Sequence, residues 1–147
     1  MTPTITIIRG LPGSGKSYYG RHLAAERGCL FIEPDMLLMR AGKYVYTKDR
    51  HENAVESCRV MINDIGCCMA DVIYADVLPT IQEVQDIAMF YDTLLGNSME
   101  VIDMPLLTVE QSIERNKHNV RREDIERMAA QWEPWEKKQK ESGGWVK

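Results

Sequence analysis

The sequence predicts a three-layer α/β fold in which helices flank a parallel β-sheet. Short apolar runs rich in β-branched residues alternate along the chain with segments of helical periodicity. A glycine-rich turn follows the first of these runs, and no linker or internal repeat divides the chain. Strands that alternate with helices at this spacing favour parallel pairing through helical crossovers. We therefore expect residues 1–147 to form a single domain.

Each expected element rests on a local pattern in the sequence. The expected strands are short apolar runs, at residues 4–8, 29–32, 72–75 and 99–103. The expected helices have an apolar face or a terminal signal, at residues 17–27, 49–65, 79–96, 108–115 and 121–140, with a helical turn at 36–40. We expect Pro79 in a first helical turn, Thr108 as a helix cap, and an interruption of the last helix near Pro134.

The composition is that of a globular protein, with 44% apolar and 27% charged residues. The net charge of -4 means that any contact with nucleic acid must be local. Residues 114–147 hold 9 basic and 7 acidic side chains, against 9 and 15 in residues 1–113, so the C-terminal quarter is the basic part. There is no signal-peptide pattern, no membrane-spanning run and no disulfide spacing among the four cysteines, so we expect a cytoplasmic protein without membrane contact.

The strongest signal lies between the first expected strand and the first expected helix. Residues 10–17 (GLPGSGKS) fit the phosphate-binding pattern G-x-x-x-x-G-K-[ST] without a mismatch. Glycines let successive backbone N–H groups point at phosphate oxygens, Lys16 would neutralise phosphate charge, and the Ser17 hydroxyl would ligate Mg²⁺. The alternative is a glycine-rich turn that binds nothing. The residues predicted to bind the nucleotide are Gly10, Pro12, Gly13, Ser14, Gly15, Lys16, Ser17, Tyr18, Arg115 and Arg122.

Two carboxylates follow expected strands at the edge of the sheet where parallel α/β folds bind ligands. Asp35 follows the second strand, where it could accept the proton of an attacking hydroxyl group or simply cap the short helix that comes next. Asp76 follows the third strand, in the position of a Walker-B acid that holds Mg²⁺, with a solvated loop residue as the alternative.

Basic and aromatic side chains near the C-terminus suggest a lid. A cluster between the last two expected helices could supply positive charge to a transferring phosphoryl group, or could be a basic helix surface. Its members are Arg115, Lys117, His118, Arg121 and Arg122. Trp132 and Trp135 could stack on a base, but their helical spacing favours packing in the core.

Several segments together carry a family resemblance over residues 4–135. They are residues 9–17, Asp35-Met36, residues 42–46, residues 115–120 and residues 125–128. In combination they resemble the compact AAA-type P-loop ATPase and kinase family that includes the kinase domain of phage polynucleotide kinase. The resemblance implies a P-loop NTPase fold of the kinase type with a C-terminal helical lid, ATP with Mg²⁺ as donor, and a nucleic-acid hydroxyl as acceptor.

The same resemblance implies roles for individual residues. Asp35 matches the general base, Lys16 and Ser17 match the phosphate and metal contacts, and Arg115 matches a lid arginine that touches the phosphates. A narrower likeness is to small phage kinases that phosphorylate 5-hydroxymethyluracil within DNA, which would place the protein in the cytoplasm of a phage host.

Three functions are therefore open. The first is an ATP-dependent kinase that acts on a polynucleotide 5′-hydroxyl or on a base hydroxymethyl group. The second is a kinase for a small molecule such as a nucleoside or a sugar. The third is a nucleotide-dependent binding protein with slow ATP hydrolysis, which would form no phosphorylated product. No pattern in the sequence predicts an oligomeric state.

Overall fold

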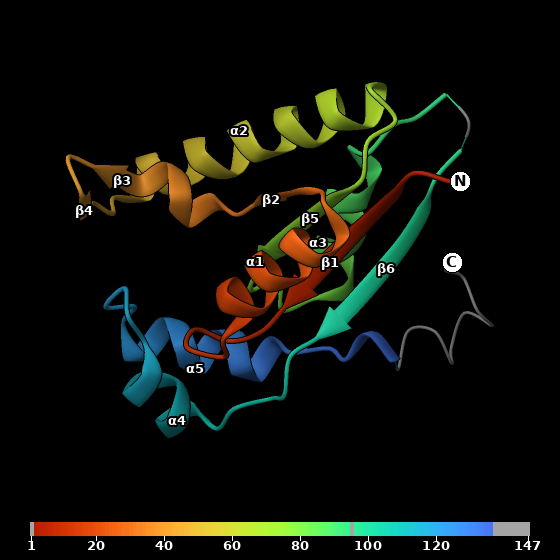
Figure 1. The fold of residues 1–147 in the computed structure, drawn as a ribbon. Coiled ribbons are helices and arrows are strands. Elements are labelled where there is room, and N and C mark those ends of the chain that lie inside the picture. The colour runs from red at the N-terminus through yellow and green to blue at the C-terminus, as the bar shows by residue number, and fades with distance from the viewer. Residues whose placement is uncertain (1, 95, 137–147) are drawn as a thin grey trace.

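The computed structural model describes residues 2–94 and 96–136, which form three layers around a parallel sheet (Figure 1). Within those residues the sheet has four strands in the order β2-β5-β1-β6. The strands are β1 (Thr4–Arg9), β2 (Leu30–Ile32), β5 (Val72–Asp76) and β6 (Ser98–Asp103). All three pairings are parallel. The predicted strands and fold class are thus confirmed, with each strand boundary within one residue of its predicted place.

Helices and a small hairpin complete the described chain. The helices are α1 (Lys16–Arg27), α2 (Lys48–Cys67), α3 (Ile81–Met89), α4 (Val109–Arg115) and α5 (Arg122–Gln131), with a 3-10 helix η1 (Pro34–Leu38) after β2. The hairpin pairs β3 (Met39–Arg40) with β4 (Lys43–Tyr44) in antiparallel register. Thr108 caps α4 through a capping box, as predicted.

The helical turn predicted at residues 36–40 lies two residues earlier, as η1, and Met39 and Arg40 form β3 instead. Both predicted boundaries of the helix at residues 79–96 are also wrong. Pro79 is not in the first turn of α3, because Thr80 caps that helix with its side chain. The same helix ends at Met89 instead of residue 96, since the chain must turn there to bury Tyr91 beneath the sheet. The interruption predicted near Pro134 is confirmed: α5 ends at Gln131, residues 132–134 are not helical, and Trp135 and Glu136 are helical again. The predicted helical residues 137–140 lie outside the described chain.

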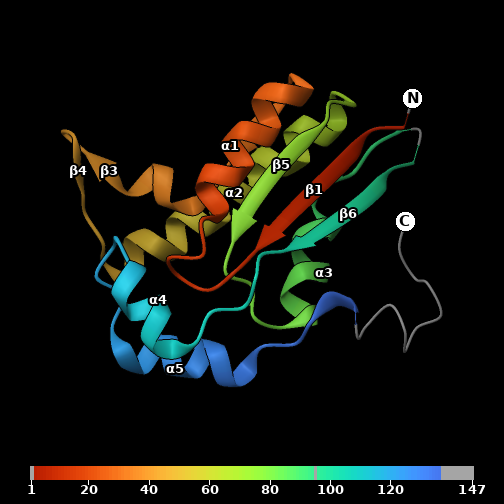
Figure 2. The same ribbon diagram turned by 60° about the horizontal axis from the view of Figure 1, so that its bottom comes forward.

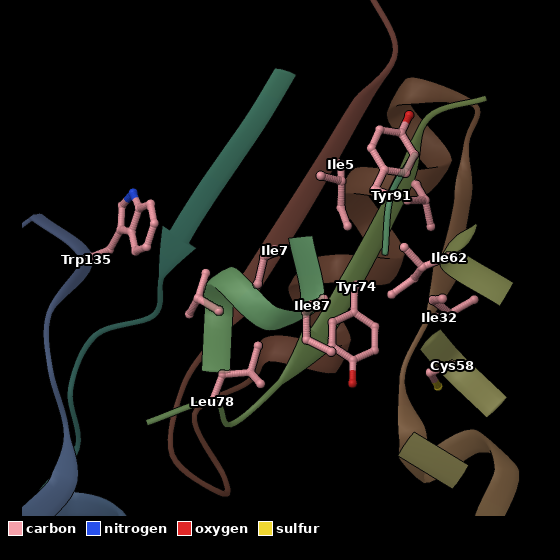
Figure 3. Close-up of a cluster of buried hydrophobic side chains, with 12 residues drawn as sticks. Ile5, Ile7, Ile32, Cys58, Ile62, Tyr74, Leu78, Ile87, Tyr91 and Trp135 are labelled. Carbon is pink, nitrogen blue, oxygen red and sulfur yellow. The ribbon is translucent and has the colours of Figure 1, made fainter. Parts of the chain in front are cut away.

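The alternation of side chains along each strand divides the core between the two faces of the sheet. On one face, Ile5, Ile7 and Tyr74 pack against helices α2 and α3, in a cluster drawn in Figure 3. On the other face, Ile8 and Ile73 pack against α1. Both faces of the central strands are therefore covered, which accounts for their nearly continuous apolar sequence.

The remaining elements gather at the carboxyl edge of the sheet. Figure 2 shows α4 and α5 beside the arrowheads of β1, β5 and β6, with the β3-β4 hairpin on the same side of the molecule. None of the described helices has the length and apolar character that a bilayer span requires.

Candidate functional site

The phosphate-binding sequence lies at the switch point of the sheet. Strand β1 is central, and the chain passes from it to β2 on one side and later returns to β6 on the other. In open parallel sheets this change of direction leaves a crevice at the carboxyl ends of the strands. Residues 10–15 leave β1 into that crevice, and α1 begins directly afterwards at Lys16.

The backbone of residues 10–15 has the conformation of a phosphate cradle. Gly13 and Gly15 have φ angles of +82° and +87°, which side chains other than hydrogen disfavour. Gly15 at the N-cap supplies no side-chain hydrogen bond, so N–H groups of the first turn of α1 are left for a ligand. Ser14 Oγ is buried and has no hydrogen-bond partner among the described residues. These features fit bound phosphate oxygens.

Three carboxylates act electrostatically on the ammonium group of Lys16. Burial lowers the pKa of Lys16, and the negative charges of Asp76, Asp35 and Glu33 oppose that shift. The structure therefore brings the predicted Lys16, Asp35 and Asp76 to one place, and it adds Glu33. Carboxylate oxygens are ligands that Mg²⁺ prefers.

Asp76 is a fixed carboxylate, so the alternative of a solvated loop residue is wrong. It lies half-buried at the end of β5, where Oδ2 accepts a hydrogen bond from the Tyr74 hydroxyl at 3.0 Å. Its Oδ1 accepts from the backbone N–H of Val77 at 2.8 Å. Burial raises the pKa of Asp76, while these two hydrogen bonds and the charge of Lys16 pull it back.

Glu33 is a site residue that sequence reasoning missed. Only 3% of it is exposed, and its Oε1 accepts a hydrogen bond from Ser17 Oγ at 2.5 Å. Its Oε2 accepts from Arg21 at 3.0 Å. Since the Ser17 hydroxyl donates its proton to Glu33, its lone pairs are free for a cation. A charged residue directly after an apolar strand at this edge was the available signal.

The oxygen set fits Mg²⁺ better than a metal that prefers a closed protein cage. The described residues contain no group of three His, Cys, Asp or Glu that could hold a metal by themselves. Mg²⁺ is usually bound by one or two carboxylates together with substrate phosphates. Ser17 and Asp76 are the residues predicted to hold it, and Glu33, which is hydrogen-bonded to Ser17, would be a further oxygen ligand.

Asp35 lies within η1 and does not cap it. The N-cap position is taken by Glu33, which makes no side-chain cap bond, so the capping alternative for Asp35 is wrong. The Asp35 side chain is 37% exposed. Its Oδ1 accepts a hydrogen bond from the Tyr44 hydroxyl at 3.2 Å, and its Oδ2 lies 3.6 Å from Nε2 of His118.

Helix α4 is attached to the phosphate-binding loop. Ser112, which is fully buried, donates a hydrogen bond from its hydroxyl to the carbonyl of Pro12 at 2.5 Å. Arg115 ends the helix so close to Gly13 that a Cβ atom on that glycine would lie 2.7 Å from the Cβ of Arg115. The structure thus brings the predicted lid arginine to the cradle.

Other residues predicted to bind nucleotide or base already contact side chains of the protein. Arg122 forms ion pairs with Glu110 and Glu126. Tyr18 is 72% exposed on α1, where its ring meets that of His22. Trp135 is buried, which confirms core packing for this residue, while the face of Trp132 carries the guanidinium of Arg9 at 4.3 Å from the ring centroid.

Comparisons with known proteins agree at the level of the fold. Neither a protein-family model nor a curated protein matches the sequence significantly. A chain of the Pnkp1/Rnl/Hen1 RNA repair complex is similar over 88% of this chain, with 20% identity and a TM-score of 0.69. A gluconokinase from Sinorhizobium meliloti 1021 is similar over 90%, with 17% identity and a TM-score of 0.57. The fold is that of a P-loop kinase.

Coverage differs among these similar structures. This P-loop kinase fold spans 44% of the chain from the RNA repair complex, but 77% of the gluconokinase chain. A shikimate kinase from Acinetobacter baumannii, solved in complex with shikimate, is similar over 88% of this chain and 73% of its own. Its identity is 20% and its TM-score 0.51. This chain thus spans less than half of the RNA repair chain and about three quarters of each of the two small-molecule kinase chains.

Proposed function

We propose that this protein transfers the γ-phosphoryl group of ATP to a hydroxyl group of a nucleic acid. The observation that supports the proposal is that Asp35 in η1 lies near enough to Lys16 of the phosphate cradle for its charge to act on the ammonium group. A phosphate-binding group and a candidate base on one crevice are the two parts that phosphoryl transfer to a hydroxyl requires. The acceptor would be a polynucleotide 5′-hydroxyl or a base hydroxymethyl group such as that of 5-hydroxymethyluracil in DNA.

In the proposed reaction the acceptor oxygen attacks the γ-phosphorus while its proton passes to an oxygen of Asp35. The bond from the γ-phosphorus to the bridging oxygen breaks, and ADP leaves. Lys16 at the start of α1 and Arg115 beside Gly13 would neutralise the charge on the phosphate oxygens. Mg²⁺ held by Ser17, Asp76 and Glu33 would draw further charge from the phosphates.

The distribution of positive charge favours a polyanionic acceptor. Residues 39–51 carry Arg40, Lys43, Lys48 and Arg50 against the single acid Asp49. Residues 115–122 carry four Lys or Arg side chains and no acid. These two segments meet at Asp35 through Tyr44 and His118, although the whole chain has a net charge of -4. Positive charge on the two segments that meet at Asp35 suits contact with a few phosphates of a short strand.

A small-molecule kinase is the second candidate, since its fold has similar dimensions. The described chain covers 77% and 73% of the gluconokinase and shikimate kinase chains. A kinase of this class would close a pocket over a free nucleoside, sugar or similar alcohol, and would gain nothing from the basic segments beyond the site.

A phosphoryl-transfer assay decides among these functions. ATP labelled in the γ-phosphate is offered with Mg²⁺ to a 5′-hydroxyl oligonucleotide, hydroxymethyluracil DNA, mixed nucleosides and sugars, and water, with Lys16→Ala as the blank. We expect label in one of the two DNA acceptors. Asp35→Asn should lower that transfer by about 10²-fold or more while ATP binding is retained. Label only in small molecules supports the second candidate, and label only in free phosphate indicates a nucleotide-dependent binding protein.

A further inference from the structure

The segment Arg115-Asn116-Lys117-His118 has a structural feature that the transfer of phosphate by itself does not explain. It leaves α4 beside the phosphate cradle and ends in a side chain at Asp35. One short segment therefore touches the donor side of the site and the acceptor side at once.

Asn116 gives this segment its shape. Its side-chain Nδ2 donates to the carbonyl of Val120 at 2.9 Å, and its Oδ1 accepts from the backbone N–H of His118 at 3.0 Å. Asn119 completes the turn with a φ of +54°, a conformation that asparagine tolerates better than most residues. The loop is thus closed on itself by one amide, and His118 is presented from a defined turn.

His118 meets the hairpin through an aromatic contact. Its ring stacks on that of Tyr44 with 4.1 Å between centroids and 25° between planes. The Tyr44 hydroxyl donates to Asp35 Oδ1, while His118 Nε2 lies 3.6 Å from Oδ2. Two stacked rings from distant parts of the chain therefore each direct one polar atom at the same carboxylate.

Both contacts act on the orientation of the Asp35 side chain. Burial and the charge of Asp35 raise the pKa of Tyr44, so its hydroxyl stays protonated and remains a donor. The gap from His118 is about 0.5 Å longer than a hydrogen bond, so a small movement of the loop toward the hairpin would complete it. A carboxylate held from both oxygens keeps only its remaining lone pairs for an acceptor hydroxyl.

We propose that His118 and Tyr44 are positioning residues for Asp35, and that the loop of residues 116–121 joins the phosphate-binding side to the acceptor side through them. The proposal rests on the proposed function, because it gives Asp35 a reacting hydroxyl to meet. A loop anchored at the cradle by Arg115 and at Asp35 by His118 orients the base only while it lies over the site. A displacement of about 1 Å at a reacting group is enough to slow an enzyme about 10²-fold.

Two substitutions of His118 separate its polar contact from its stacking contact. His118→Gln keeps an N–H donor near the place of Nε2 and loses the ring, while His118→Phe keeps the ring and loses the donor. We expect His118→Phe and Tyr44→Phe each to lower kcat for transfer about tenfold, with KM for ATP unchanged, and His118→Gln to keep most of the activity. The opposite result, with His118→Phe active and His118→Gln inactive, would show that His118 acts only through its ring contact with Tyr44. That result would overturn the proposal.

Measurements in the Asp35→Asn background test whether the effect passes through Asp35. If it does, His118→Phe should cause little further loss there, because residues that act as one unit are not additive. A further tenfold loss of kcat in that background would overturn the positioning role, but it would not contradict the proposed kinase activity. Absence of transfer by the wild-type protein to every acceptor overturns the proposed function and this proposal together.

Hydrogen exchange gives a readout that does not depend on activity. Tyr44→Ala should raise exchange at the amides of residues 116–120, because it removes the ring on which His118 stacks. Tyr46→Ala is the matched control, since Tyr46 is on the same connection, is 57% exposed and contacts His51 instead. Equal exchange at these amides in the two variants would contradict the proposed contact between the loop of residues 116–121 and the β3-β4 hairpin.

Discussion

Substitution of Arg9 by methionine should destabilise the fold more than any exposed charge substitution. Arg9 ends β1 directly before the phosphate-binding loop, and its side chain is fully buried. Its guanidinium donates to the carbonyls of Leu78 at 2.7 Å and Glu133 at 2.9 Å, and to the Asp103 carboxylate at 3.0 Å. The hydrogen bonds of this one side chain thus connect the ends of β1, β5 and β6 to the segment after α5.

The size of the effect follows from what the substitution leaves behind. Methionine has a similar length and fills the space, but the Leu78 and Glu133 carbonyls lose their charged donor, at about 1–3 kcal/mol for each buried group left unpaired. Asp103 is 27% exposed, so water can replace part of its lost bond. We expect a loss of about 3–5 kcal/mol, as for other buried pairs that lose one partner. For a domain of this size that corresponds to a fall in Tm of roughly 10–15 °C.

Urea and thermal unfolding followed by circular dichroism would measure this loss. Arg27→Met is the matched control, because Arg27 pairs with Glu100 at 3.0 Å but has a side chain that is 41% exposed. Exposed pairs of this kind contribute about 0.2–1 kcal/mol. If the free energies of unfolding of the two variants lie within about 1 kcal/mol of each other, the argument that Arg9 fastens the edge of the sheet is wrong.

Three further predictions concern the site and the core. Gly13→Ala should destabilise the protein by about 1–3 kcal/mol and weaken binding of an ATP analogue in calorimetry, because the new Cβ would lie 2.7 Å from that of Arg115. Gly28→Ala, at φ +67° with open space around it, should cost only about 1 kcal/mol and leave binding unchanged. Glu33→Gln should raise the Mg²⁺ concentration needed for half-maximal transfer about tenfold, because it removes a charged ligand oxygen that also orients the Ser17 hydroxyl; an unchanged requirement would remove Glu33 from the metal site. Burial raises the pKa of Tyr91 to about 12, so the stability it contributes is complete below about pH 10 and is lost as the pH rises through 12. Tyr91→Phe should therefore show a shallower alkaline fall in the free energy of unfolding.

The layered fold and the phosphate cradle could be predicted because each depends on short-range patterns. A β-branched run such as residues 4–8 can be buried on both faces only in the centre of a covered sheet. The cradle is set by glycines and a lysine at fixed spacing, between a strand and a helix. In both cases the physical requirement acts within about ten residues, so the sequence carries it directly.

The contacts that organise the site depend on partners far away in the chain, and these could not be predicted. In the sequence, Arg9 has the pattern of a polar residue at the end of a strand. It can be buried only because carbonyls 69 and 124 residues away accept its hydrogen bonds. The local sequence predicts that Glu33 is part of a turn, and only the fold brings Ser17 into hydrogen-bonding contact with it. His118 belongs to a basic cluster in the sequence, and only the fold brings it to Asp35. Tertiary proximity decided the role of each residue, and no local pattern encodes it.

The difference between Arg9 and Lys16 separates charge that holds the fold from charge that serves the ligand. Burial lowers the pKa of both side chains, yet Arg9 has its acceptors within the protein, while the ammonium of Lys16 donates no hydrogen bond to any residue that the structure describes. Lys16→Met should therefore abolish transfer but keep the free energy of unfolding within about 1 kcal/mol of the wild type or raise it, as substitutions of strained functional groups often do. The same urea titrations measure both variants. The contrary result is that Lys16→Met lowers the free energy of unfolding as much as Arg9→Met does. In that case Lys16 would stabilise the fold of the free protein, and the argument that a ligand supplies the missing partner of Lys16 would be wrong.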